Sequence, residues 1–145
     1  MRISSRPFMA LAALCLATGG AVHALAYPKA AAIAENSALP RFFSAAFEGL
    51  WLSDAASSIS FALAFGAIAV WPRLASRALV VLLALAPLAS AATIYATMGS
   101  FFAGHLMLLA GSAVLIGGAL HRHPTFGPRG PLGGDGDAAD TRPIT

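Results

Sequence analysis

The sequence predicts an all-α integral membrane protein, a bundle of four transmembrane helices that run up-down-up-down with both chain ends in the cytoplasm. Of its 145 residues, 58% are hydrophobic and only 10% are charged, far more apolar than an ordinary soluble domain. The apolar residues gather in four runs, each long enough to cross a hydrocarbon core of about 30 Å. The basic residues between these runs are unevenly distributed, and their distribution predicts the orientation.

The four predicted spans cover approximately residues 7–26, 51–71, 78–98 and 101–120. The first contains no Asp, Glu, Lys or Arg, and Asp54 is the only such residue in the second. The third contains Pro87, which removes a backbone donor and clashes with the preceding turn, so we expect a kink there. In the fourth, His105 is the only titratable group.

Lys and Arg residues are concentrated in segments that would share one side of the membrane. If the N-terminus is cytoplasmic, the outer loop holds only Lys29 and Arg41. The cytoplasmic segments hold the other seven: Arg2, Arg6, Arg73, Arg77, Arg122, Arg129 and Arg142. This bias predicts a multi-pass protein of the inner (plasma) membrane.

A cleaved signal peptide is the alternative interpretation of residues 1–26. A basic start, an apolar stretch and the small-x-small sequence at 24–26 have the form of a signal peptide and its cleavage site. Cleavage would leave three helices in the same orientation. The apolar stretch continues through Val22, longer than a typical signal-peptide core, and this favours a retained helix.

An amphipathic segment precedes the second span. We interpret residues 41–50 either as a helix in the outer interface or as a helical extension of the second span.

The sequence divides into a membrane domain and a tail. Residues 1–120 form the membrane domain, and residues 121–145, rich in Gly and Pro, are predicted to be a disordered cytoplasmic tail.

Stripes of small residues predict where the helices pack, because close packing in lipid depends on side chains that let backbones approach. The first span carries such a stripe, and we expect Ala17→Leu or Gly20→Leu to disturb packing more than Leu16→Ala. The stripes are Ala10, Ala13, Ala17, Gly20 and Ala24 in the first span, Ser58, Ala62 and Gly66 in the second, and Gly111, Ala113, Gly117 and Gly118 in the fourth.

Polar side chains from all four spans fall at one depth in the outer leaflet, about 22–25 Å from the cytoplasmic end at the rise of an α-helix. They are the candidate ligand-binding residues: His23, Asp54, Ser58, Thr93, Tyr95 and His105. One interpretation is a shallow pocket open to the outer face, with Asp54 and His105 at its centre. The other is that these groups are interfacial anchors, since Asp54 lies one turn from Trp51.

These features favour a non-enzymatic accessory or structural membrane protein. The alternative is a transporter or binding bundle for a small molecule or an ion, built around Asp54 and His105. We expect no catalytic residues, because no nucleophile and base form a recognisable pair, and no metal site or cofactor, haem included. The expected partners are the lipid bilayer and another membrane protein or a second copy of this chain; nucleic acid is not expected.

Overall fold

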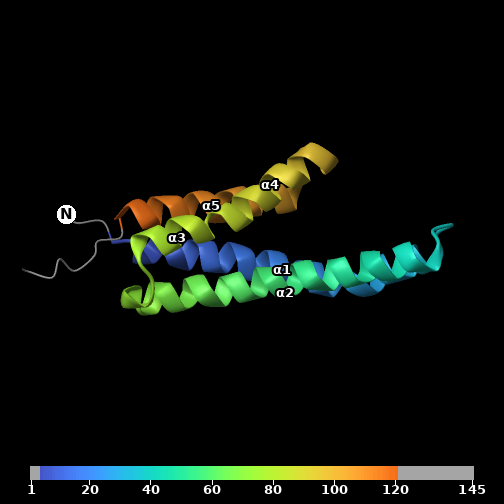
Figure 1. The fold of residues 1–145 in the computed structure, drawn as a ribbon, viewed down its shortest axis with the longest axis horizontal. Coiled ribbons are helices and arrows are strands. Elements are labelled where there is room, and N and C mark those ends of the chain that lie inside the picture. Colours follow the sequence, from blue (N-terminus) through green and yellow to red (C-terminus); the bar gives the residue numbers. More distant parts are fainter. Residues whose placement is uncertain (1–3, 121–145) are drawn as a thin grey trace, which may run out of the picture.

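The computed structural model describes residues 4–120, and this part of the chain consists of helices and their connections (Figure 1). The elements are α1 (Arg6–Glu35), α2 (Arg41–Val70), the short 3-10 helix η1 (Pro72–Leu74), α3 (Arg77–Leu83), α4 (Leu85–Met98) and α5 (Phe102–Leu120). The tail predicted at 121–145 lies outside the described residues.

Within residues 4–120, four helical stretches are long and apolar enough to cross a membrane: Arg6–Glu35, Arg41–Val70, Arg77–Met98 and Phe102–Leu120. The third consists of α3 and α4 together. The all-helical class and the number of candidate spans are therefore confirmed, and they indicate a multi-pass membrane protein.

α1 and α2 both continue beyond the predicted spans. α1 runs past residue 26 to Glu35 with Pro28 inside it, and α2 begins at Arg41, directly after Pro40. Of the two interpretations of residues 41–50, the helical extension of the second span is the one observed. The result is a long hairpin of α1 and α2 that reaches beyond α4 and α5 in Figure 1.

Where a kink was expected from Pro87, the third stretch is divided into two helices. α3 ends at Leu83, the residue four positions before Pro87, and α4 begins at Leu85. Pro87 has no N–H to offer the Leu83 carbonyl, and its ring crowds that turn. Beyond this break, α4 and α5 diverge from the α1 and α2 hairpin in Figure 1.

Two central helices, α1 and α5, make most of the contacts between helices. α1 packs extensively against α2 and against α5, and α5 packs in turn against α3 and α4. α2 has no comparable contact with α5. The described helices are therefore arranged in the order α2, α1, α5, then α3 and α4, rather than around one common axis.

The tightest packing lies in the half of the molecule nearest the N-terminal end of α1. Here five large side chains are almost fully buried: Met9, Leu16, Phe65, Val80 and Val114. Glycines of α5 make this possible, because a Cβ at Gly117 would collide with Met9, and one at Gly118 would lie 3.2 Å from Val80. The small-residue stripe predicted on the fourth span is fully buried and so is confirmed.

The stripe predicted on the first span is wrong for most of its residues. Gly20 is buried against α2, but Ala17 is exposed, and Leu16 is only 2% exposed inside the core. The buried face of α1 is instead formed by Met9, Ala12, Cys15, Leu16 and Gly20. Alanine is so abundant in this helix that neighbouring faces carry similar spacings, and spacing alone selected the wrong face.

Candidate functional site

The half of the α1 and α2 hairpin farther from the N-terminal end of α1, called its outer half after the predicted orientation, carries the first polar cluster. The His23 Nε2 atom lies 3.6 Å from the Asp54 carboxylate, within ion-pair distance. The His23 ring stacks on the Trp51 indole with centroids 4.1 Å apart, and the indole N–H donates a hydrogen bond of 2.8 Å to the His23 carbonyl. Trp51 therefore fixes both the ring and the backbone of His23 against α2.

A second polar cluster lies where α4 and α5 meet. The Tyr95 hydroxyl is hydrogen-bonded to His105 Nδ1 at 2.6 Å, and the Ser100 hydroxyl lies 3.3 Å from His105 Nε2. Gly104 allows this approach, because a Cβ there would lie 3.2 Å from the Tyr95 ring. Both ring nitrogens of His105 thus have a partner within α4, α5 and the turn between them.

The two clusters do not form the single pocket that the sequence suggested. Asp54 pairs with His23, and His105 pairs with Tyr95, so the two residues expected at its centre have different partners. The remaining candidates are engaged elsewhere. Ser58 is buried where α1 and α2 meet, and the Thr93 hydroxyl donates to the Ala89 carbonyl of its own helix.

Both clusters lie at the surface of the described part of the chain. The side chain of Asp54 is 54% exposed and that of His23 is 29% exposed, and His105 is also exposed. Such groups can exchange hydrogen bonds with lipid headgroups or with a partner, as interfacial residues do.

Ser100 was not among the residues predicted from the sequence. It lies five residues before His105, in the turn between α4 and α5, and this spacing could have indicated its contact with His105. A hydroxyl beside an imidazole is the minimum of a nucleophile and base pair. In this case the other imidazole nitrogen is hydrogen-bonded to the Tyr95 hydroxyl instead of a carboxylate. The Asp54 carboxylate contacts the His23 ring, not His105.

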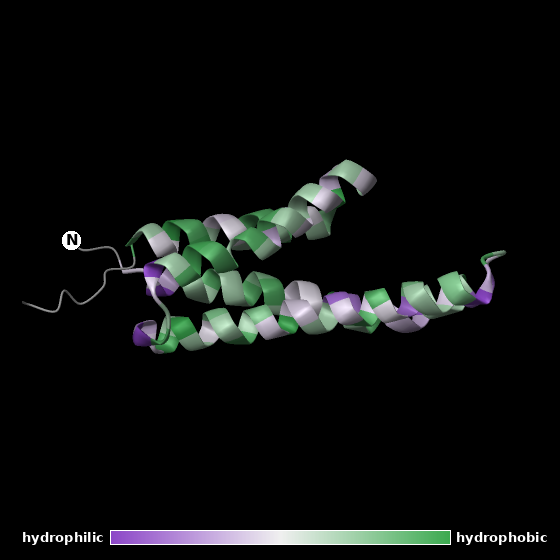
Figure 2. Ribbon diagram, in the orientation of Figure 1, coloured by the Kyte–Doolittle hydropathy of each residue, from purple (hydrophilic) through white to green (hydrophobic). Residues whose placement is uncertain are grey.

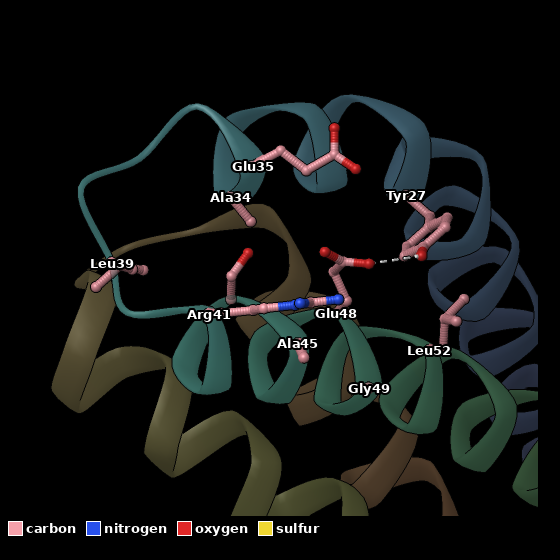
Figure 3. Close-up of a pocket in the computed structure, with 10 residues that line it drawn as sticks. Tyr27, Ala34, Glu35, Leu39, Arg41, Ala45, Glu48, Gly49 and Leu52 are labelled. Atoms are coloured by element: carbon pink, nitrogen blue, oxygen red, sulfur yellow. Dashed lines mark hydrogen bonds between the residues drawn. The ribbon is translucent and has the colours of Figure 1, made fainter.

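Sequence reasoning also missed a pocket at the outer end of the hairpin, because it depends on how far α1 and α2 extend. The pocket has a volume of about 620 Å³ and lies between the last turns of α1 and the first turns of α2 (Figure 3). Its lining is Tyr27, Ala34, Glu35, Leu39, Arg41, Ser44, Ala45, Glu48, Gly49 and Leu52. None of the six predicted site residues is among them.

Within residues 4–120, no group of three or more His, Cys, Asp or Glu side chains is placed to hold a metal ion. Cys15 is buried in the core between the helices.

The chain matches no family model, no curated protein and no solved structure.

Proposed function

We propose that this chain is a non-enzymatic accessory protein of the inner membrane that contacts a partner membrane protein through the outer end of its α1 and α2 hairpin. In this proposal the four spans cross the membrane up-down-up-down, with both chain ends in the cytoplasm.

The distribution of charge supports this orientation. Arg6 begins α1, Arg73 lies in η1 and Arg77 begins α3, so these three residues lie at the same end of the molecule. Lys29 and Arg41 lie towards the opposite end, in the outer half of the hairpin. Figure 2 shows hydrophilic residues at both ends and along the outer half of the hairpin. The end with more arginines is the cytoplasmic one by the positive-inside rule.

The single observation that carries the proposal is the length of the hairpin. α1 and α2 have 30 residues each, or about 45 Å at 1.5 Å per residue, whereas α5 has 19 residues, or about 28 Å. The length of α5 already matches a hydrocarbon core of about 30 Å. The hairpin therefore projects by about 15 Å beyond the outer hydrocarbon boundary.

The projecting part of α2 carries apolar side chains that this chain leaves uncovered. Phe42 is 75% exposed and Leu50 is 72% exposed, and Phe43 and Phe47 are also exposed. Burying one such side chain contributes about 1.5–3 kcal/mol, so a surface with several of them favours association. A partner with an apolar segment at the outer interface would cover them.

The alternative, a transporter or binding bundle around Asp54 and His105, has less support. These residues lie on α2 and α5, two helices without extensive contact, and each has another polar partner: Asp54 contacts His23, and His105 is hydrogen-bonded to Tyr95. A transport pathway through the bundle would need them to face one common cavity.

Photo-crosslinking in native membranes tests the accessory role. A photoreactive residue at Phe43 should form adducts with a second protein, because this position projects from the outer end. The matched control is Leu82, which is 62% exposed on α3 within the third span and should give lipid adducts. Lipid adducts alone at both positions would contradict the proposal. Adducts consisting of two copies of this chain would indicate a homo-oligomer and would also contradict it.

A further inference from the structure

We propose that the pocket at the outer end of the hairpin binds a zwitterion of the phosphoethanolamine type, a ligand with one primary ammonium group and one phosphate. This inference goes beyond the accessory role and concerns the cleft between α1 and α2 rather than the exposed phenylalanines of α2; its argument from depth rests on the proposed placement of the spans in the membrane.

The acidic side of the pocket is held in place by a tyrosine. The Tyr27 hydroxyl of α1 donates a hydrogen bond of 3.2 Å to the Glu48 carboxylate of α2. Glu48 is partly buried, and its carboxylate is directed into the pocket in Figure 3. Glu35, at the end of α1, contributes a second carboxylate to the lining. Carboxylates placed on two helices can accept the several N–H donors of a primary ammonium group.

The basic side of the same pocket is formed by the first turn of α2. Arg41 and Ser44 both line the cavity, and the Arg41 side chain extends along α2 towards Glu48 in Figure 3. A guanidinium matches the geometry of phosphate oxygens, and a serine hydroxyl can add one hydrogen bond. The cavity therefore has both negative and positive side chains in its lining. A ligand with a single charge would pair with only one of these two kinds of side chain.

The level of the pocket also fits a headgroup. Tyr27 lies about 32 Å from the start of α1, and Glu48 lies about 33 Å from the end of α2, at the rise of an α-helix. Both values fall just beyond a hydrocarbon core of about 30 Å, in the layer of phospholipid headgroups. Leu52 lines the pocket on the hydrocarbon side. The ligand is therefore either the headgroup of an outer-leaflet phospholipid or the free zwitterion in the outer solution.

Native mass spectrometry of the full chain in mild detergent tests the lipid form. Phosphatidylethanolamine should bind in preference to phosphatidylcholine, which lacks ammonium N–H donors, and to phosphatidylglycerol, which lacks the ammonium group. Glu48→Gln keeps an acceptor for Tyr27 but removes the charge, and Arg41→Ala removes the guanidinium. Each should weaken binding by about tenfold or more, because each variant removes a charge that the ligand pairs with. Lys29→Ala, a charge change outside the lining, should leave binding unchanged.

Calorimetric titration of the same protein with free phosphoethanolamine separates the two sources. If the free zwitterion binds and both pocket variants weaken it, the ligand chemistry is supported, and the source is soluble. If only the phospholipid is selected, the source is the bilayer. Thermal unfolding in detergent checks that Arg41→Ala and Glu48→Gln remain folded. Binding of neither ligand, equal binding of all three phospholipids, or full binding by the folded variants would overturn the proposal.

Discussion

The half of this molecule nearest the N-terminal end of α1, the inner half, and the opposite or outer half are held together by different interactions. In the inner half, large side chains such as Met9, Leu16 and Phe65 are buried against small residues of neighbouring helices. In the outer half, the helices form two pairs, and each pair has its own polar contact, His23 with Asp54 and Tyr95 with His105. The hydrophobic effect does not drive helices together in lipid, so they associate through close packing and polar contacts. In the inner half close packing joins the helices, whereas in the outer half the polar contacts link them only in pairs.

The largest effect is expected where α5 packs on α4 in the inner half. A Cβ at Gly111 would lie 2.6 Å from the Leu88 Cγ atom, so Gly111→Leu should force α4 and α5 apart. We expect a loss of about 3 kcal/mol of unfolding free energy, at the upper end of overpacking effects. Gly49→Leu is the control, since no atom lies within 4 Å of a Cβ at Gly49. Denaturant titration in detergent should separate the two variants, and equal losses would show that α5 is not closely packed.

A somewhat smaller loss is expected from Leu16→Ala, because Leu16 is 2% exposed in the core. Removing a buried leucine side chain leaves a cavity and should reduce stability by about 2 kcal/mol or more. Ala17→Leu adds volume on the adjacent, exposed position of α1 and should be nearly neutral. Thermal unfolding of both variants provides the comparison. A greater effect of Ala17→Leu would mean that the packed face of α1 is the small-residue stripe predicted from the sequence.

The polar contact of the outer half should give a smaller effect. Tyr95→Phe removes the hydroxyl bonded to His105 and should reduce stability by about 1 kcal/mol, the net contribution of one such hydrogen bond. A double-mutant cycle with His105→Leu should show a coupling of similar size. Additive effects in that cycle would mean that Tyr95 and His105 do not meet in the folded protein.

The smallest effect is expected at the projecting end of α2. Gly49 is helical and has open space around its missing side chain, so Gly49→Ala should stabilise the helix by about 0.5–1 kcal/mol. Circular dichroism on heating would detect a higher transition temperature. A lower one would mean that this segment does not stay helical or that an alanine methyl meets an obstacle there.

The helical class, the number of spans and the break before Pro87 were predictable from the sequence. Run length, composition and the missing N–H of a proline act locally, so their effects can be derived without knowing the packing. The buried face of α1 could not be derived in the same way, because Ala17 and Gly20 are both small and only the position of α2 distinguishes them.

The positions of the candidate residues along their helices were predictable, but not which of them meet. His23, Asp54, Tyr95 and His105 all lie in the half of the molecule farther from the N-terminal end of α1. Which of them meet depends on the order in which the helices pack and on the divergence of α4 and α5, and neither follows from spacing along one helix. The pocket around Glu48 depends on the extension of both helices past the predicted spans.

Thiol cross-linking tests most directly the claim that the outer half consists of two separate polar contacts. In a Cys15→Ala background, cysteines placed at His23 and Asp54 should be joined efficiently by a short bifunctional reagent, because these side chains meet at 3.6 Å. Cysteines at Asp54 and His105 should not be joined, because α2 and α5 lack extensive contact. Efficient cross-linking of Asp54 to His105, with none between His23 and Asp54, would contradict the arrangement described and would restore a single shared pocket.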